Sequence, residues 1–358
     1  MTHFLHVSPS FAPGGAQVRT AQIINSLGPS FRHTLVALDG RFETAERIDR
    51  EIAVTCLPVP KHRNPMKAIA LFLAMMRQQR PAALLTYNWG SMDAVVAAGL
   101  CRVCPVIHTE DGFGPEEASS QKLRRVAFRR LALTSARYVI APSHTLRRIM
   151  TGTWGLPASK VRYIPNGIDV DRFVPAAPDT ERREVTVGSV GHLRPEKCYH
   201  VLIEACAMAG RRRPLRLLLA GDGVERERLE RTAQACGFRE RVTFLGHQED
   251  VRSVYRRLDI FALSSSTEQM PLSVLEAMAS GLPVVCSDVG DVRQMVSAEN
   301  RGQVCAPGEL HTALGDLAAD AGLRRDIGMA NRKRAVAEYA LDRMCGAYRE
   351  LYRGALPA

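Results

Sequence analysis

Two glutamates that are eight positions apart, Glu268 and Glu276, lie on either side of an expected helix start. An apolar strand over 260–263 runs into a polar loop that carries Glu268, and a short helix that carries Glu276 follows. Because proline suits the first turn of a helix, we expect Pro271 at the first helical position and Met270 at the N-cap. A glycine and a proline soon afterwards signal the end of the helix.

A methionine N-cap cannot accept hydrogen bonds from the amides of Leu272 and Ser273. The sequence therefore predicts a helix start with spare N–H groups and a positive dipole end, which is an anion site that suits phosphate. The flanking carboxylates suit hydroxyl groups, and Gln269 and Pro271 lie in the same turn. Phosphates beside hydroxyls point to a nucleotide-sugar as the ligand.

Cations for a diphosphate are expected on the loop that begins at Gly191, where Arg194 and Lys197 precede a helix. The alternative for these two side chains is plain solvation. Gly221 and Leu245 end two further apolar strands and are predicted to form a wall for a base. Glu276 is expected on a buried helix, where a carboxylate is costly unless it is bonded. Ribose hydroxyls would satisfy it, and the alternative is an internal salt bridge with an arginine.

The first half of the chain offers Gly14-Gly15 after its first strand and His108 at the end of a later one. Paired glycines let the backbone approach a phosphate or sugar, although a simple tight turn is the alternative. The turn lacks the full dinucleotide-binding pattern, but Asp39 stands where a ribose-binding acid would. His108 could bond a sugar hydroxyl or phosphate, or be satisfied by backbone.

A basic segment, 122–131, mixes five cations with apolar residues at helical spacing. All of the net charge of +11 lies in residues 1–165, which hold 21 Lys and Arg against 10 Asp and Glu. Both facts favour a helix that meets an anionic membrane surface or acceptor, although a solvated helix face is the alternative. The expected contact residues are Lys122, Arg124, Arg125, Arg129 and Arg130.

The length of 358 residues and the alternation of apolar strands with amphipathic helices predict two parallel α/β domains. We expect an acceptor-binding Rossmann-like domain over 1–165, a nucleotide-sugar-binding Rossmann-like domain over 166–330, and a C-terminal helix over 331–358 that packs back toward the first domain. No signal sequence or apolar run of membrane-spanning length is evident, and the nine cysteines fit a reducing cytoplasm. The expected strands cover 4–7, 34–38, 83–86, 106–108, 138–141, 186–190, 215–220, 242–245, 260–263 and 284–287.

Together these motifs resemble glycosyltransferase family 4, whose members are retaining enzymes with the two-domain GT-B fold, in which two such domains face each other across a cleft. The resemblance covers nearly the whole chain and rests on GGAQ (14–17), His108, PNGID (165–169), GHLRPEK (191–197), AGDG (220–223), FLG (244–246) and the Glu268–Glu276 spacing.

The resemblance implies that Lys197 grips the diphosphate, Glu276 holds the ribose and Glu268 contacts the transferred sugar. It further implies that backbone amides near 270–273 face the donor, that His108 lies near the sugar and that the Gly14-Gly15 turn lies near the phosphates. The chain departs from the family pattern at His192, where arginine is usual, and at Gln269, where glycine is usual.

We therefore expect a retaining glycosyltransferase that moves a hexose-type sugar from a nucleotide-diphosphate sugar, UDP rather than GDP, to a hydroxyl of a lipid-linked or polysaccharide acceptor in cell-surface glycan synthesis. No cofactor or metal is expected, since cations flank the diphosphate and no D-x-D loop is present. The expected location is cytoplasmic, on the inner face of the membrane, with no nucleic-acid partner. The alternatives are a sugar-nucleotide epimerase, a nicotinamide oxidoreductase and a non-catalytic binding protein.

Overall fold

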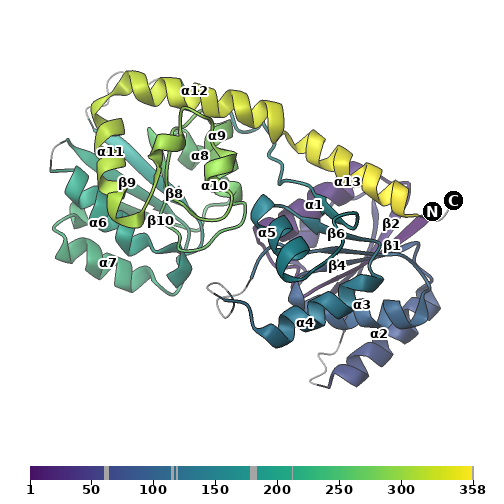
Figure 1. Ribbon diagram of the computed structural model, residues 1–358. Helices are drawn as coiled ribbons and strands as arrows, with labels where there is room; N and C mark the ends of the chain where they lie inside the picture. The colour runs from purple at the N-terminus through teal and green to yellow at the C-terminus, as the bar shows by residue number, and fades with distance from the viewer. Residues whose placement is uncertain (60–63, 114–116, 118–119, 178–183, 212, 357–358) are drawn as a thin grey trace. The chain divides into compact units, whose positions relative to one another are not determined.

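The computed structural model describes residues 1–59, 64–113, 117, 120–177, 184–211 and 213–356. The chain forms two compact units (Figure 1). Unit 1 contains Met1–Asn166 together with Arg343–Ala358, and unit 2 contains Gly167–Asp342. Residues 331–342 thus group with unit 2, whereas the sequence analysis placed them with the returning C-terminal helix.

Unit 1 is built on a seven-stranded parallel sheet in the order β3-β2-β1-β4-β5-β6-β7. The order reverses between β1 and β4, and ligands of such sheets bind at the carboxyl ends of the strands on either side of this point. The strands are β1 (Thr2–Ser8), β2 (Phe31–Ala37), β3 (Ala53–Pro58), β4 (Ala83–Tyr87), β5 (Val106–Thr109), β6 (Tyr138–Ala141) and β7 (Val161–Tyr163). The α-helices are α1 (Gly15–Leu27), α2 (Pro65–Gln79), α3 (Met92–Cys101), α4 (Leu123–Ala132), α5 (His144–Arg148) and α13 (Leu341–Ala355).

Unit 2 repeats the design with six parallel strands in the order β10-β9-β8-β11-β12-β13, so its reversal lies between β8 and β11. The strands are β8 (Val185–Val190), β9 (Leu215–Ala220), β10 (Val242–Gly246), β11 (Ile260–Leu263), β12 (Val284–Ser287) and β13 (Val304–Cys305). The α-helices are α6 (Tyr199–Ala209), α7 (Arg226–Ala235), α8 (Arg252–Tyr255), α9 (Leu272–Ala279), α10 (Val292–Met295), α11 (Leu310–Ala319) and α12 (Ala321–Glu338). The predicted fold class of two parallel-sheet α/β domains is confirmed.

The structure adds three strands that the sequence analysis did not predict, namely β3, β7 and β13. All three are edge strands of their sheets, and β7 and β13 are only three and two residues long. Strand β3 is largely exposed and therefore lacks the continuous apolar run of a buried parallel strand. Weak hydrophobic patterning at these edges explains why they were missed.

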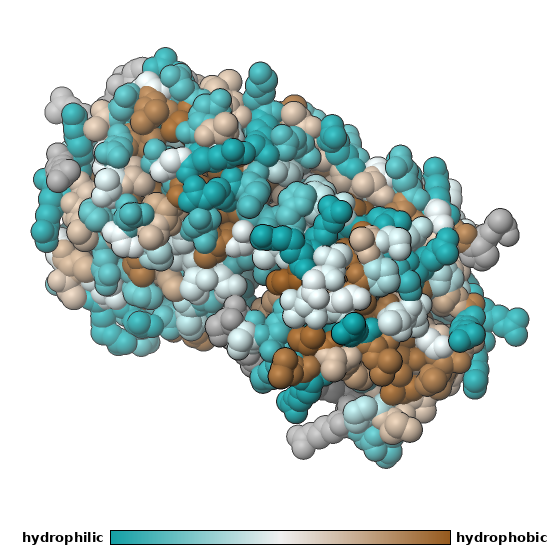
Figure 2. All heavy atoms as spheres, viewed as in Figure 1, coloured by the Kyte–Doolittle hydropathy of each residue, from teal (hydrophilic) through white to brown (hydrophobic). Residues whose placement is uncertain are grey.

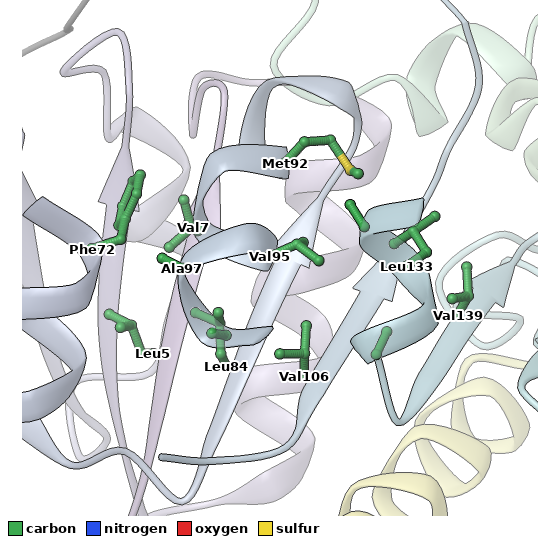
Figure 3. Close-up of a cluster of buried hydrophobic side chains, with 14 of the residues drawn as sticks. Leu5, Val7, Phe72, Leu84, Met92, Val95, Ala97, Val106, Leu133 and Val139 are labelled. Carbon is green, nitrogen blue, oxygen red and sulfur yellow. The ribbon is translucent and has the colours of Figure 1, made fainter. Parts of the chain in front are cut away.

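Apolar side chains of the central strands of unit 1 pack against the helices on one face of the sheet (Figure 3). Leu5 and Leu84 from the sheet and Val95 from α3 are among the fully buried residues of this core. Close packing here fixes α3 and α4 against the sheet, and with them the loops at the strand ends.

The last helix, α13, completes unit 1 rather than unit 2. Its ring of Tyr352 lies 5.6 Å from the ring of Phe4 in β1, and Arg349 donates a 2.8 Å hydrogen bond to the carbonyl of Ser26. Just before α13, Ile168 pairs with Ala340 through two 2.8 Å backbone hydrogen bonds within unit 2. The helical segment from 331 onward is therefore broken at Tyr339-Ala340 into α12 and α13.

Three histidines of unit 1, His3, His6 and His33, are buried together, and His6 Nε2 lies 2.9 Å from His33 Nδ1. Burial, and then the charge of His3, lowers the pKa of His33 to about 4, and burial also lowers the pKa of His6 well below its usual value. The folded state thus binds fewer protons than the unfolded state below pH 6.5. Stability contributed by the neutral rings is complete above that pH and is lost as the pH falls toward 4.

We expect the free energy of unfolding from urea titrations to fall between pH 7 and pH 4.5, by up to about 1.4 kcal/mol per pH unit for each histidine that titrates. His33→Gln should flatten this dependence, whereas His311→Gln, at a half-buried position in unit 2, should leave it unchanged. A pH profile of His33→Gln that matches the wild type would exclude His33 as a source.

Candidate active site

Two loops of unit 2 flank the point where its strand order reverses, one after β8 and one after β11. The Ser264 hydroxyl donates a 2.8 Å hydrogen bond to the carbonyl of Lys197, and the amide of Ser266 donates a 2.9 Å bond to the carbonyl of Glu196. These bonds join the loop that carries Lys197 to the loop that carries Glu268. Lys197 and Glu268, two predicted site residues that are 71 positions apart in the sequence, are thereby brought together.

The side chains of Lys197 and Glu268 form an ion pair, with Lys197 Nζ 2.5 Å from Glu268 Oε1. Ser265 donates a second hydrogen bond, 2.8 Å long, to the same oxygen. Both charged side chains remain partly accessible, at 15% and 13% exposure. An ammonium has three N–H donors, so Lys197 can hold Glu268 and still donate to an anionic ligand.

Helix α9 begins one residue later than predicted. Pro271 is the N-cap, with an extended backbone at φ −68° and ψ 124°, and Leu272 is the first helical residue. The predicted N-cap, Met270, is instead buried one position upstream. The reason is that this backbone geometry leaves Pro271 outside the helix.

The correction does not change the chemistry of the helix start, because proline has no side-chain acceptor either. In the part of the chain that the structure describes, no protein acceptor is recorded for the amides of Leu272 and Ser273. Two backbone donors at the positive end of a helix therefore follow Glu268 by four and five positions in the sequence.

Glu276 lies in the second turn of α9 and is half-buried. Its carboxylate accepts a 2.7 Å hydrogen bond from the hydroxyl of Tyr255, which also lies 3.2 Å from the carbonyl of Ser273. Burial raises the pKa of Glu276, and the bond from Tyr255 opposes this shift. The arginine partner considered in the sequence analysis is thus replaced by a tyrosine, and a carboxylate can accept further hydrogen bonds from ligand hydroxyls.

The loops after β8, β9 and β10 pack backbone against backbone at glycines. The amide of Gly191 bonds to the carbonyl of Ala220 at 2.9 Å, and the amide of Gly221 bonds to the carbonyl of Gly246 at 2.8 Å. At Gly221 φ is +134°, and a Cβ there would overlap the carbonyl oxygen of Gly191. Only glycine permits this close approach.

Gly221→Ala is expected to destabilise unit 2 by about 2–5 kcal/mol, because it adds both a steric overlap and a strained backbone. Urea unfolding measures the effect. Gly302→Ala is the matched control, since a Cβ at Gly302 meets no atom within 4 Å and φ is not positive there. Equal stability of the two variants would contradict the close packing.

The remaining predicted residues of unit 2 occupy the same rim of the sheet. Arg194 is exposed, and its Nε lies 3.0 Å from Glu196 Oε1, so in this structure it pairs with its neighbour. The carbonyl of Gln269 accepts a 3.0 Å bond from the amide of Asp291, and Gly290 leaves room for this contact. The carbonyl of Leu245 at the end of β10 accepts a 2.8 Å bond from Gln248.

Sequence reasoning missed four residues that hold the site together: Tyr255, Ser265, Gly290 and Asp291. Tyr255 and Gly290 come from segments outside the motifs, so only the tertiary structure shows their role. Gly290 could have been predicted, because a glycine in a polar loop indicates a backbone with positive φ, and its φ is +57°.

In unit 1, His108 lies near the end of β5 and is fully buried, at 0% exposure. Its Nδ1 lies 2.9 Å from the Thr86 hydroxyl, and its Nε2 lies 3.8 Å from Glu110 Oε2. A side chain rather than the backbone therefore bonds His108 Nδ1, whereas the buried Nε2 has no hydrogen-bond partner among the described residues. The Gly14-Gly15 turn joins β1 to α1, with Gly14 at the helix N-cap and no side-chain cap.

The basic helix α4 requires one correction to the expected contact residues. Arg129 is not on the surface: its side chain is 1% exposed, and its guanidinium bonds to Glu117 at 2.9 and 3.2 Å. Three aromatic rings lie within 5.3 Å of it, and Glu110 Oε2 lies 3.7 Å from its Nε. Arg125 also bonds to Glu117, at 3.0 Å, while Arg124 and Arg130 are exposed and Lys122 is half-buried.

Arg129 thus compensates two buried carboxylates. Burial opposes the ionisation of Glu117, but hydrogen bonds from Arg129 and Arg125 outweigh it and lower the pKa of Glu117 to about 2. The positive charge at Arg129 therefore belongs to the interior of unit 1 and does not contribute to its outer surface.

Across the residues that the structure describes, no three His, Cys, Asp or Glu side chains are grouped in a way that could hold a metal ion. The expectation that the site needs no metal stays a prediction. None of the described helices is both long and apolar enough to span a bilayer.

Both halves of the chain match known family models. Residues 13–172 match "Glycosyltransferase Family 4", and residues 171–334 match "Glycosyl transferases group 1". The chain belongs to this family of glycosyltransferases, as the motifs in the sequence indicated.

Among its relatives is the GDP-mannose-dependent alpha-mannosyltransferase of Mycobacterium tuberculosis, which is 30% identical over 277 residues that cover 74% of this chain and 69% of the relative. The UDP-Gal:alpha-D-GlcNAc-diphosphoundecaprenol alpha-1,3-galactosyltransferase of Escherichia coli is 27% identical over 223 residues, covering 58% of this chain and 57% of the relative. The chain spans about half the length of several curated relatives that it matches.

The fold resembles the crystal structure of Anabaena Alr3699/HepE in complex with UDP, with a TM-score of 0.83 at 20% sequence identity. The match covers 99% of this chain and 100% of the other. This likeness supports the expected fold of two parallel-sheet α/β domains.

Proposed function

We propose that this protein is a retaining glycosyltransferase that transfers a hexose-type sugar from a UDP-sugar to a hydroxyl of a lipid-linked or polysaccharide acceptor in cell-surface glycan synthesis. The observation that carries the proposal is the Lys197–Glu268 ion pair at the reversal point of the unit 2 sheet, together with the N-terminus of α9, which has no side-chain cap. Family membership supports the reaction class.

In the proposed complex, the amides of Leu272 and Ser273 and the ammonium of Lys197 bind the diphosphate. Charge builds on this group as it leaves the sugar, and donors fixed in advance stabilise that charge without reorganising. Glu276, oriented by Tyr255, accepts from the ribose hydroxyls, and Glu268 accepts from a hydroxyl of the sugar. Attack of the acceptor hydroxyl on the face that the diphosphate leaves gives net retention.

UDP is favoured as the nucleotide because the HepE structure contains UDP and the E. coli relative is named for UDP-Gal. The mycobacterial relative is named for GDP-mannose, so GDP is the competing nucleotide. Thermal-shift measurements with UDP-, GDP-, ADP- and dTDP-sugars decide between them. We expect the largest stabilisation with a UDP-sugar, and a larger shift with a GDP-sugar would overturn this assignment.

The reaction is tested by incubating the preferred UDP-sugar with and without a lipid-linked acceptor. A transferase forms a glycosylated lipid only when the acceptor is present. An epimerase would instead release a changed sugar without any acceptor, and a binding protein would release no nucleotide. Either of these outcomes would refute the proposal.

We also propose a cytoplasmic protein that binds the inner face of the membrane through the outer surface of α4. Arg124 and Arg130 are exposed there, beside Leu123 at 85% and Leu131 at 75% exposure. Each arginine near an anionic surface contributes about 1 kcal/mol. The double variant Arg124→Ala/Arg130→Ala should therefore bind anionic liposomes about 30-fold more weakly in flotation assays. Equal binding of the wild type to neutral and anionic liposomes would contradict this location.

A further inference from the structure

Unit 1 contains a cavity of about 530 Å³ between the start of α2, the turn after β4, and helices α3 and α4. This volume is within the range of small-molecule binding pockets. His108, on β5, is not among the residues that line this cavity. Its lining includes Ile69, Trp89, Asp93, Val96, Arg124 and Phe128.

The cavity is mainly apolar, and Arg124 and Arg125 are among the residues that line it. The rings of Trp89 and Phe128 meet edge to face at 5.6 Å, and Ile69 and Val96 are half-buried against the same space. Arg124 is exposed, whereas Arg125 is engaged with Glu117 and lies 5.1 Å from the centre of the Trp89 ring. An apolar pocket with a cation at its edge is complementary to a ligand that joins a hydrocarbon chain to an anion.

The surface around the cavity extends this apolar character. Met66 at the start of α2 and Leu123 at the start of α4 are largely exposed. Figure 2 shows hydrophobic residues gathered over the part of unit 1 where Figure 1 places α2, α3 and α4. An apolar surface of this kind marks an interaction site.

We propose that this cavity binds the hydrocarbon chain of a phosphate-bearing lipid, with the phosphate at Arg124. The inference rests on the proposed function, because it assigns the lipid of the acceptor to a place on this chain. A free phosphate alone is a poor occupant, since the lining is mostly apolar and Asp93 would repel an anion inside the cavity. The hydrocarbon chain of the lipid therefore enters the cavity, and its phosphate stays outside.

Farnesyl phosphate, held below its micelle concentration and without vesicles, is a suitable probe. Isothermal calorimetry should show saturable binding to the full chain, at least about tenfold tighter than farnesol, and no binding of inorganic phosphate. Val96→Asp and Val96→Phe, which charge or fill the cavity, should each weaken binding about tenfold. Arg124→Ala should weaken it several-fold, and Asp93→Asn should strengthen it.

Leu131→Asp is the matched control, because Leu131 is exposed on the same helix but does not line the cavity. It should bind the probe as the wild type does, and thermal unfolding checks that each variant is folded. Absence of farnesyl phosphate binding would overturn the proposal, and so would an equal loss in Leu131→Asp, which would indicate adsorption to the outer face of α4. UDP binding measured on the same samples tests the donor site separately, so the proposed function and this inference can fail independently.

Discussion

Lys197→Ala is expected to lower the rate of sugar transfer by about 10²–10³-fold, because it removes a preorganised charge from the leaving diphosphate. The substitution also removes the ion-pair partner of Glu268 and leaves its hydrogen bond from Ser265. Since both side chains are partly accessible, the fold should survive. Steady-state kinetics with the preferred donor, together with a thermal unfolding curve, measure both effects.

Glu276→Ala should act differently, by lowering the affinity for the nucleotide. Loss of a charged hydrogen-bond acceptor for ribose is expected to raise the dissociation constant of UDP by about 10–100-fold. Tyr255→Phe keeps the carboxylate and removes only its 2.7 Å hydrogen bond, so its effect should be smaller.

Arg228→Ala is the matched control for both variants, because it breaks an ion pair with Glu225 of the same unit and its side chain is 54% exposed. It should retain wild-type kinetics. Wild-type turnover in both Lys197→Ala and Glu276→Ala would refute the roles assigned to these residues.

Arg129→Met is expected to destabilise unit 1 by about 3–5 kcal/mol, since it leaves the carboxylates of Glu110 and Glu117 buried with less compensating charge. It also removes a cation that lies 4.8 Å from the centre of the Trp89 ring. Urea unfolding at pH 7 measures the change. An effect of this size on a domain is a large share of its total stability.

Arg124→Met on the same helix is the control, because Arg124 is exposed and its removal should cost less than about 0.5 kcal/mol. If the two variants were equally stable, Arg129 would not have the structural role that the structure gives it. If Arg129→Met instead retained full stability and lost only liposome binding, the original expectation of a surface contact would be restored.

Much of the fold could be predicted because buried parallel strands are continuous apolar runs. The bounds of β9, β11 and β12 agree with the predicted ranges, and the meeting of the loops after β8 and β11 follows from the order of parallel strands. Edge strands such as β3 and β13 carry too little buried surface for such a signal.

The errors at the site have identifiable physical causes. Proline is compatible with both the N-cap and the first helical position, and only the observed ψ of 124° at Pro271 separates them. The Tyr255–Glu276 bond joins residues of two helices that are 21 positions apart in the sequence, and no local pattern shows such a contact. Arg129 had a usable signal, because it shares a helical face with Val126 and Leu133, and Leu133 is buried.

The most direct test of the account is a crystal structure of this protein with UDP bound. We expect diphosphate oxygens within hydrogen-bonding distance of the amides of Leu272 and Ser273 and of Lys197 Nζ, with both ribose hydroxyls near Glu276. UDP seated elsewhere on unit 2, with those two amides bonded to protein or water, would contradict the central claim.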